Sequence, residues 1–457
     1  MESEKYLARI EPIAQQPNGD IEEDGGYLVD AVPRAELERR GSSNERVAER
    51  EPMPFLALIT RESLRGVRTE SGWVQISVSA NPSEGDAIPA EMAFSTQNAG
   101  DGPERFSVSV EEGEPPESLV QVIEQAATFE QTADASIGEI REVFEKVCRH
   151  ADAGDVGIAV YDVGQASMSA VVDCYEHPLM FFDMGWPLWF NAKSNPLNKD
   201  FDPLHDFAKK PAPVVLSHLD WDHWGYTIEK GLAKKDKATG AWITEPTYRV
   251  RALNRAWLLT RPEVARHGLG PSHLHFVRTL EVLKGVGDSK LLFWPHRKKS
   301  LSIGSLHIIR NVPAIGLSKP SFLRNNESLS ICVRAGGANA LLCGDADYPS
   351  IPERFRESLC ALVAPHHGGR ITPGTTPYAV GHGRMVVSAF GGCYRSIPCG
   401  DSMDEAFEHG WRTARTDDRY SCSRCHEIHG NRLVRLLSTP KCGCGGVDRS
   451  GLCVSRD

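Results

Sequence analysis

The distribution of apolar and polar residues separates an irregular first part of the chain from a regular second part. Residues 1–50 are polar and rich in Gly, Pro and Glu, and we expect part of this stretch to lack regular structure. Three strand-like runs and two stretches with helical spacing of apolar residues follow, at 55–60, 73–79, 106–110, 118–129 and 136–150. They predict a small α+β domain over residues 1–155, ending in a Gly- and Asp-containing turn.

From Gly157 onward, short apolar runs typical of buried strands dominate the chain. These predicted strands cover residues 156–163, 168–174, 179–183, 306–310, 329–334, 340–343 and 385–389. Helical patterns intervene at 251–259, 273–284 and 404–408. Strands mixed with helices in this way predict two sheets, or one large mixed sheet, covered by helices. We assign residues 156–420 to this second domain.

Composition and charge narrow the class of protein. Hydrophobic residues make up 40% of the chain and charged residues 25%, as in ordinary soluble proteins. The richest apolar run, 179–190, is interrupted by Asp183, and the acidic N-terminus does not resemble a signal peptide. We therefore expect a cytoplasmic protein without membrane contact. Residues 1–155 carry a net charge of −18 and the remainder +8, so only the second part is suited to a polyanionic partner.

The strongest chemical signal is the segment from His218 to His223, which follows the apolar run 214–217. It predicts a buried strand that delivers two imidazoles and two carboxylates to a loop, a ligand set that suits zinc or manganese. His218 and Asp220 project the same way from an extended backbone, whereas the last two residues can turn toward a second ion. An ordinary polar loop is disfavoured, because such groups seldom crowd together without a partner for their charge.

Four further motifs place an acid or an imidazole directly after an apolar run. They are Tyr161–Ser167, Phe182–Gly185, Leu342–Asp345 and Ala364–Gly369. Strand ends that carry such groups can converge on one metal centre.

In this order the motifs resemble those of the metallo-β-lactamase fold superfamily, and within it the soluble domain of bacterial competence DNA-uptake proteins. The resemblance covers roughly residues 157–420. The segments that carry it are Asp162–Gln165, Asp183, Ser217–Gly225, Asn325–Leu329, Leu341–Asp345, Pro365–Gly368 and Ala414–Asp417. Asp220, where the wider superfamily has His, is typical of this branch. Ala166 and Gly369 depart from the usual Gly and Ser, and residues 394–401 lack the usual GHP-like tripeptide.

The resemblance implies an αββα sandwich that binds two divalent ions, Zn or Mn, about 3.5–4 Å apart, which activate a water for attack on phosphorus. His218 and Asp220 would bind the first ion, and Asp222 and His223 the second. Asp345 would bridge the two ions.

The remaining site residues follow from the same resemblance. His366 or His367 would complete the second metal position, while the other contacts substrate or donates a proton. Asp222 would also help to activate the water. Asp183 would support the orientation of a metal ligand. Taken by their residue types alone, Asp162 shapes a turn near the site, and Asn325 and Asn326 are either a strand-entry cap or a substrate contact. Additional first-metal ligands are sought, with less support, among five other histidines: His267, His273, His275, His296 and His307.

A Cys-rich segment occupies residues 421–457. Cys422 and Cys425 form one thiol pair, and Cys442 and Cys444 form another. Two such pairs in a reducing compartment indicate a structural zinc site. The alternative is a tail of unligated cysteines.

Together these features predict a metal-dependent hydrolase with a binuclear site, acting as a phosphodiesterase or nuclease on nucleic acid or nucleotides. A bacterial defence or DNA-processing setting would give the N-terminal domain a protein partner. The first alternative is an esterase for small phosphodiesters of the phosphorylcholine type. The second is an inactive binding or scaffold protein, against which the intact acid and His set argues.

Overall fold

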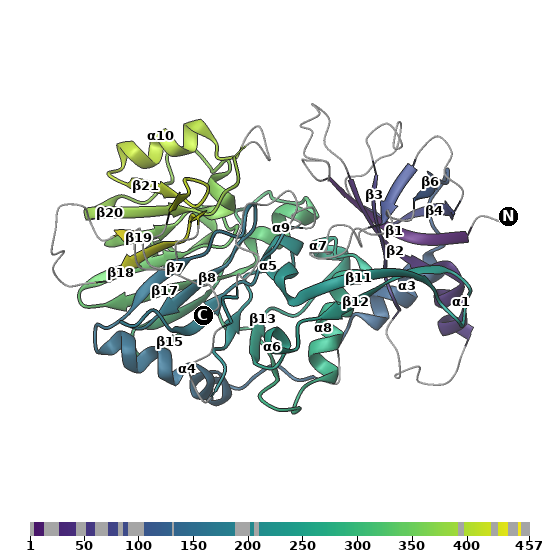
Figure 1. Cartoon of the computed structure of the whole chain (residues 1–457), viewed down its shortest axis with the longest axis horizontal. Coiled ribbons are helices and arrows are strands. Elements are labelled where there is room, and N and C mark those ends of the chain that lie inside the picture. The colour runs from purple at the N-terminus through teal and green to yellow at the C-terminus, as the bar shows by residue number, and fades with distance from the viewer. Residues whose placement is uncertain are drawn as a thin grey trace.

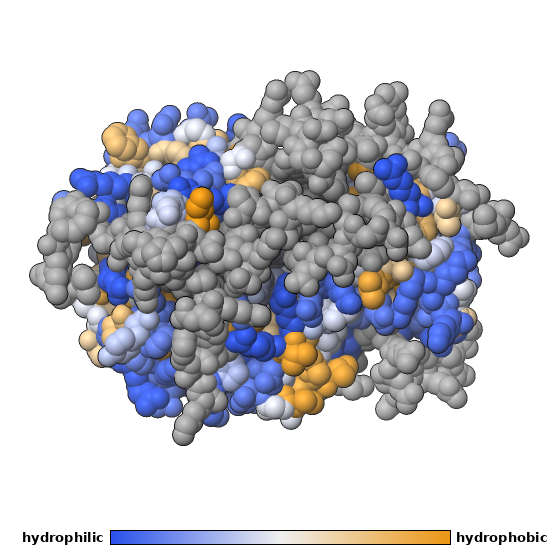
Figure 2. Space-filling model, in the orientation of Figure 1, coloured by the Kyte–Doolittle hydropathy of each residue, from blue (hydrophilic) through white to orange (hydrophobic). Residues whose placement is uncertain are grey.

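The computed structural model places an N-terminal barrel beside a larger sandwich of two sheets (Figure 1). It describes residues 4–12, 27–42, 52–59, 72–80, 86–89, 105–129, 132–187, 202–204, 210–391, 397–421, 428–436 and 447–448. In the described part of the chain no helix is both long and apolar enough to cross a bilayer. Hydrophilic residues predominate among the described residues of the face in Figure 2.

The barrel is closed by six strands in the order β1-β2-β3-β5-β6-β4. Their bounds are β1 (Glu4–Pro12), β2 (Tyr27–Pro33), β3 (Phe55–Ile59), β4 (Val74–Ser79), β5 (Asp86–Pro89) and β6 (Phe106–Val110). Alternate residues, such as Tyr6, Ala8 and Ile10 of β1, fill its interior. Helices α1 (Arg34–Ser42) and α3 (Glu117–Ala126) contact each other beside it. β1 and β2 were not predicted, because the polar composition around them obscured this alternation.

Two mixed sheets form the sandwich. The first runs in space as β14 (Lys290–Phe293), β13 (Ala256–Leu259), β10 (Val214–Val215), β9 (Pro178–Phe182), β8 (Ser169–Val172), β7 (Gly157–Val160), β24 (Arg432–Arg435) and β25 (Val447–Asp448). The second runs as β15 (Ser300–Ile303), β16 (Leu306–Arg310), β17 (Leu329–Ala335), β18 (Ala338–Leu342), β19 (Leu359–Val363), β20 (Ala379–Val387) and β21 (Arg412–Arg415).

Each strand divides its apolar residues between two cores. Ile158 and Val160 of the first sheet share one buried cluster with Ile331 and Leu342 of the second, which fills the space between the sheets. The intervening Ala159 belongs to the cluster that includes α8 (Pro271–Val282). A third cluster joins the second sheet to α10 (Gly400–Glu408). The predicted mixed α/β fold is confirmed, with helices outside two stacked sheets.

The structure departs from the sequence prediction in three further places. Residues 251–259, predicted as one helix, form the short α6 (Val250–Leu253) and strand β13, because an apolar run buried on both faces fits either structure by its periodicity. Helix α4 (Ile137–Asp152), grouped above with the N-terminal domain, packs against strands of both sheets of the sandwich. Strand β24, beyond residue 420, pairs with β7 inside the first sheet.

The hairpin of β11 (Ile228–Lys235) and β12 (Trp242–Tyr248) extends from the sandwich along the barrel (Figure 1). The Tyr6 hydroxyl donates to the Trp242 carbonyl at 2.9 Å, and the Thr244 amide donates to the Pro54 carbonyl at 2.7 Å. The barrel is therefore docked on the sandwich by hydrogen bonds as well as by apolar contact.

The remaining elements are short. They are α5 (Trp221–Trp224), η2 (Gly225–Thr227), α7 (Val264–His267), α9 (Pro320–Asn326), η3 (Tyr348–Ser350), η4 (Glu353–Phe355), η5 (Pro365–Gly368), β22 (Tyr420–Ser421) and β23 (Ile428–His429). Several of them begin where a sheet strand ends, and these junctions carry the candidate site.

Candidate metal centre

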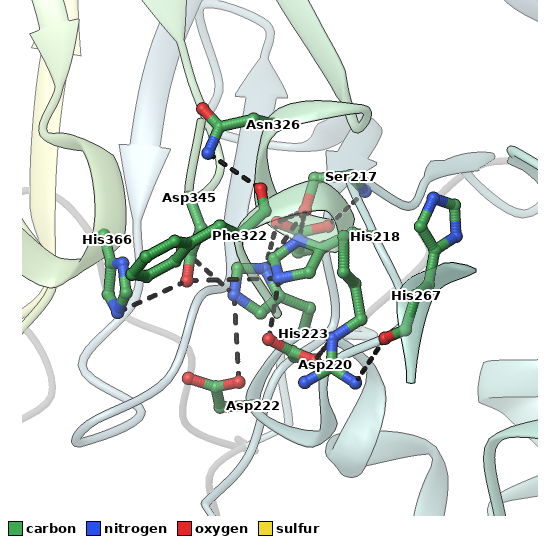
Figure 3. A network of polar contacts seen from close by, with 12 residues as sticks. Ser217, His218, Asp220, Asp222, His223, His267, Phe322, Asn326, Asp345 and His366 are labelled. Atoms are coloured by element: carbon green, nitrogen blue, oxygen red, sulfur yellow. Dashed lines mark hydrogen bonds and ion pairs between the residues drawn. The ribbon is translucent and has the colours of Figure 1, made fainter. Parts of the chain in front are cut away.

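The predicted metal-binding residues meet where strands of both sheets end (Figure 3). In the first sheet, β9 and β10 are parallel and are followed by Asp183 and by the 218–223 segment. In the second sheet, β18 and β19 are parallel and are followed by Asp345 and by the His366–His367 pair. Because both sheets present these ends at one side of the sandwich, residues far apart in sequence come together.

His223 is held from behind by a buried carboxylate. Its Nδ1 lies 2.8 Å from Oδ2 of Asp183, which is fully buried and also accepts hydrogen bonds from the amide (2.7 Å) and hydroxyl (2.9 Å) of Ser217. An Nδ1 that faces a carboxylate carries the proton, so Nε2 of the neutral ring presents its lone pair. That Nε2 lies 3.1 Å from Oδ1 of Asp345 and has no hydrogen-bond partner among the described residues.

His367 has the same arrangement on the other side. Its Nδ1 lies 3.0 Å from the Ser388 carbonyl oxygen, which can only accept a hydrogen bond, and its Nε2 lies 3.0 Å from Oδ2 of Asp222. The backbone φ angles of His366 and His367 are +48° and +56°, in the left-handed region that non-glycine residues seldom occupy. Such strain is typical of sites where the surrounding structure fixes a side chain for function.

These contacts satisfy a simple test of whether the residues suit a cation. In two places, the imidazole nitrogen that would carry the lone pair of the neutral ring faces a carboxylate oxygen at hydrogen-bond distance. Two acceptors at that distance repel each other unless a proton or a metal ion lies against them. The donor set fits a divalent metal of the zinc or manganese type.

Two overlapping groups of ligand atoms are compact enough to hold an ion. One consists of His218, His223 and Asp345, and the other of Asp222, His223 and His367. His223 has only Nε2 free, because Nδ1 is bound to Asp183, so it can serve one ion. Assigning it to Asp222 and His367 leaves His218 with Asp345 for the other position.

The electrostatics of the cluster favour its ionised forms. Burial works against the charged imidazole of His223, but Asp345, Asp183 and Asp222 outweigh it and raise the pKa of His223 well above its ordinary value. Burial also opposes ionisation of Asp345, yet His223 and His366 lower the pKa of Asp345 well below its usual range. Opposite charges thus stabilise one another where water is largely excluded.

Asp220 has a partner that the sequence did not reveal. Its Oδ2 lies 3.1 Å from Nε2 of His218, whose Nε2 in turn lies 4.0 Å from Oδ2 of Asp345. Its Oδ1 is bound by Nε of Arg324, a buried residue of α9. Burial opposes ionisation of Asp220, but Arg324 and His218 lower the pKa of this carboxyl below its usual range.

His366 lies on the open side of the cluster. Its side chain is 43% exposed and its Nε2 lies 3.9 Å from Oδ2 of Asp345. Adjacent in sequence, His366 and His367 face different carboxylates. The arrangement favours His367 beside Asp222 and His223, and the assignment of His366 as a ligand stays a prediction.

The other two predicted supporting residues, Asp162 and Asn326, lie outside the ligand groups. Asp162 is buried, accepts from Nε of Arg419 at 2.6 Å, and links the end of β7 to the segment before β24. Asn326 accepts from the Asp347 amide at 3.0 Å and from the Ser350 hydroxyl at 2.7 Å. Asn326 thereby fixes the turn that follows Asp345.

The backbone around Asp222 is enclosed by two other loops. The carbonyl of Asp222 accepts from the Ser167 amide at 2.8 Å, and the Ser167 carbonyl accepts from the Gly185 amide at 2.7 Å. A Cβ at position 185 would lie 1.7 Å from the Asp222 carbonyl oxygen. Gly185 is required by this close approach.

The five other histidines considered as ligands do not join either group in the described part of the chain. His267 pairs with Glu327 at 2.9 Å, and His275 with the Tyr248 hydroxyl at 2.9 Å. His307 contacts Ser302, and His296 contacts Asp134 through its backbone amide. His273 is fully buried and neither ring nitrogen has a hydrogen-bond partner among the described residues. The cysteines of the predicted zinc site, at 422, 425, 442 and 444, lie outside the described residues.

No protein-family model and no curated protein matches the chain. Solved structures similar to it include the metallo-beta-lactamase fold protein YhfI from Bacillus subtilis, at 11% identity and a TM-score of 0.30, covering 56% of this chain and 95% of that one. A metal-dependent hydrolase of the beta-lactamase superfamily is similar at 12% identity and a TM-score of 0.32, with 57% and 96% covered. Zinc-bound PqqB from Methylobacterium extorquens is similar at 11% identity and a TM-score of 0.31, with 56% and 97% covered.

Proposed function

We propose that this chain is a metal-dependent hydrolase of the metallo-β-lactamase type that cleaves phosphodiester bonds in nucleic acid or nucleotides. One observation carries the metal-dependent part of the proposal. The free Nε2 atoms of His223 and His367 face carboxylates at 3.1 and 3.0 Å, while the Nδ1 atom of each ring is committed to another acceptor. Such a cluster is suited to divalent cations, which would replace the protons that otherwise lie between these rings and the carboxylates.

The ligand atoms divide into two positions. Asp222, His223 and His367 would hold one ion, and His218 with Asp220 would hold the other. Asp345 has one carboxylate oxygen toward His223 and the other toward His218, as a bridging ligand requires. Two divalent ions at such a centre supply Lewis-acid polarisation of the phosphoryl group and activation of a water.

The protein's own residues orient and transfer protons around that centre. Asp183 and the Ser388 carbonyl hold the two imidazoles in the tautomer that leaves Nε2 free. Asp222 is 32% exposed at its side chain and has Oδ1 free of the His367 contact, so it is placed to accept a proton from water. The exposed imidazole of His366, on the open side of Asp345, is placed to protonate a leaving oxygen.

The substrate class rests on the sequence. The motifs resemble those of the competence-type branch, and residues 156–457 carry a net charge of +8, which suits a polyanion. The small-phosphodiester alternative and the inactive scaffold remain as outcomes of the test below.

The test begins with metal content and continues with turnover. Full-length protein prepared with zinc or manganese should retain about two ions per chain at this centre. With added manganese it should hydrolyse at least one of single-stranded DNA, duplex DNA, RNA or a dinucleotide. Asp222→Ala should abolish this activity without unfolding the chain, whereas Asp236→Ala, in the turn of the β11–β12 hairpin, should not.

Each contrary result has a distinct meaning. Absence of bound metal after metal-replete preparation would refute the hydrolase. Turnover of phosphorylcholine esters without cleavage of any nucleic acid would replace the substrate class. Bound metal with no hydrolysis of any phosphodiester would favour the scaffold.

A further inference from the structure

The N-terminal barrel reaches the metal centre through one side chain. Glu11, near the end of β1, accepts a hydrogen bond from Nη1 of Arg324 at 3.1 Å. The same guanidinium contacts Oδ1 of Asp220 through Nε and donates to the His267 carbonyl at 3.2 Å. A residue at position 11 is thus one side chain away from a predicted metal ligand.

The charged groups of Glu11, Arg324 and Asp220 alternate in sign along this connection. Arg324 is only 8% exposed at its side chain and lies between two carboxylates. The charge of Arg324 by itself would offset that of Asp220, so that only the carboxylate of Asp345, 4.0 Å from Nε2 of His218, would remain beside that ring. Glu11 places a second carboxylate on the other side of the guanidinium: burial raises the pKa of Glu11, but Arg324 and Arg9 favour its charged form, which offsets part of the positive charge of Arg324. The guanidinium of Arg9, on the same strand, is stacked over the Trp73 ring, 4.6 Å from its centroid.

The geometry is specific as well as the charge. Arg324 meets the two carboxylates with different nitrogens of one planar group, through a hydrogen bond from Nη1 to Glu11 and an ion pair from Nε to Asp220, so the placement of one bears on the other. With Oδ1 of Asp220 taken by Arg324, Oδ2 is the oxygen that faces Nε2 of His218, at 3.1 Å. Glu11 in turn fixes the orientation of the Arg324 fork.

The barrel is anchored firmly enough to hold Glu11 in place. Asp30 of β2 is fully buried, accepts from the Ser272 amide at 3.1 Å and also binds the Ser272 hydroxyl at the start of α8. A Cβ at position 270 would lie 2.1 Å from Oδ2 of Asp30, so the two units approach as closely as a glycine allows.

We propose that Glu11 is a positioning residue of the metal centre, contributed by the N-terminal barrel. It balances the charge of Arg324, so that Asp220 keeps both its orientation and its negative charge toward a cation at His218. This inference rests on the proposed function, since it presumes that the centre binds metal. In this proposal the N-terminal barrel contributes a residue that the metal centre needs.

The experiment measures metal affinity, independently of hydrolysis. Metal-free full-length protein is titrated with Zn²⁺ alone, and in a second series with Mn²⁺ alone, against a competing chromogenic chelator. Glu11→Gln keeps the shape and the hydrogen-bond acceptor but removes the charge. We expect the dissociation constant of the weaker-bound ion to rise by at least about tenfold, which corresponds to about 1.4 kcal/mol.

Two further variants separate charge from structure. Glu11→Asp keeps the charge and should stay within about threefold of the wild type. Glu4→Gln removes a carboxylate of the same strand that accepts from the Trp242 amide at 2.9 Å, and it should leave metal affinity unchanged. Thermal melting of the metal-free proteins checks that each variant folds.

The outcomes distinguish this inference from the proposed function. If the wild type binds no metal, the proposed function fails. If the wild type binds two ions and Glu11→Gln binds them equally well, or if Glu11→Asp is as weak as Glu11→Gln, the role of Glu11 is overturned while the metal site stands.

Discussion

Asp183→Asn is the sharpest perturbation of the centre that touches neither a ligand nor the backbone. Asp183 is fully buried, has a φ of +63° and accepts three hydrogen bonds. Asparagine has nearly the same shape and tolerates left-handed backbone better than other non-glycine residues. The substitution therefore changes the charge and the donor pattern rather than the fold.

The donor pattern decides the tautomer of His223. If the amide oxygen keeps the bond to the Ser217 amide, the amide nitrogen faces Nδ1 of His223, and two N–H groups would meet. The imidazole avoids this by moving its proton to Nε2, the atom 3.1 Å from Asp345. The lone pair needed for metal binding is then lost.

The size of the effect follows from the lost interactions. A hydrogen bond to a charged group contributes about 1.5–3 kcal/mol. Replacing a residue that hydrogen-bonds to a metal ligand typically lowers metal affinity or activity by about 10–100-fold. We expect the dissociation constant for Zn²⁺ to rise and the rate of phosphodiester hydrolysis to fall by that factor. The free energy of unfolding of the metal-free protein should fall by about 1–3 kcal/mol.

Metal titration and urea unfolding of the same preparations measure both quantities. Asp173→Asn is the matched control, because Asp173 is also largely buried and accepts two backbone hydrogen bonds at 2.9 Å, but in the turn before β9. An Asp183→Asn protein that binds zinc within about twofold of the wild type would refute the tautomer argument.

Three further predictions concern single residues around the centre. His367→Ala should lose one bound ion and at least about 100-fold of the activity, whereas His366→Ala should keep both ions; metal analysis and initial rates measure these quantities. Loss of an ion in His366→Ala but not in His367→Ala would refute the assignment. Burial lowers the pKa of His273 to about 3. Below about pH 6.5 the unfolded chain therefore binds a proton at this residue that the folded protein does not bind, and the free energy of unfolding decreases as the pH falls through that range. His273→Phe should therefore lose about 2 kcal/mol less than the wild type between pH 7 and pH 5 in urea unfolding, and parallel losses would contradict this. Gly185→Ala should reduce both folded yield and metal content, because its Cβ would lie 1.7 Å from the Asp222 carbonyl oxygen, while Gly72→Ala, which meets nothing within 4 Å, should behave as the wild type.

Elements with a one-sided or fully apolar pattern were predictable from the sequence almost to the residue. The expected strand 306–310 coincides with β16, and the expected strand 329–334 falls short of β17 by one residue. Both strands are buried, so hydrophobic periodicity alone determines them. The same logic placed Asp183, Asp345 and the 218–223 segment at strand ends, where the structure has them.

The local hydrophobic pattern did not predict the structure of segments whose conformation is decided by neighbouring elements. Residues 256–259 became a strand because β10 and β14 pair with it on either side, which no local signal encodes. The choice between His366 and His367 depends on two successive left-handed residues, and adjacent identical side chains give no hint of which one turns inward.

The environment of Asp220 shows a deeper limit of sequence reasoning. The predicted cation-binding residues follow strand ends, and each lies within a few positions of an apolar run. The charge around them depends in addition on Arg324 and Glu11, which lie 313 residues apart. The buried guanidinium of Arg324 offsets the charge of Asp220, and Glu11 reaches this guanidinium because the barrel is docked on the sandwich. The predicted ligands can therefore be named from the sequence, whereas the charge that surrounds the first position depends on how the two units pack.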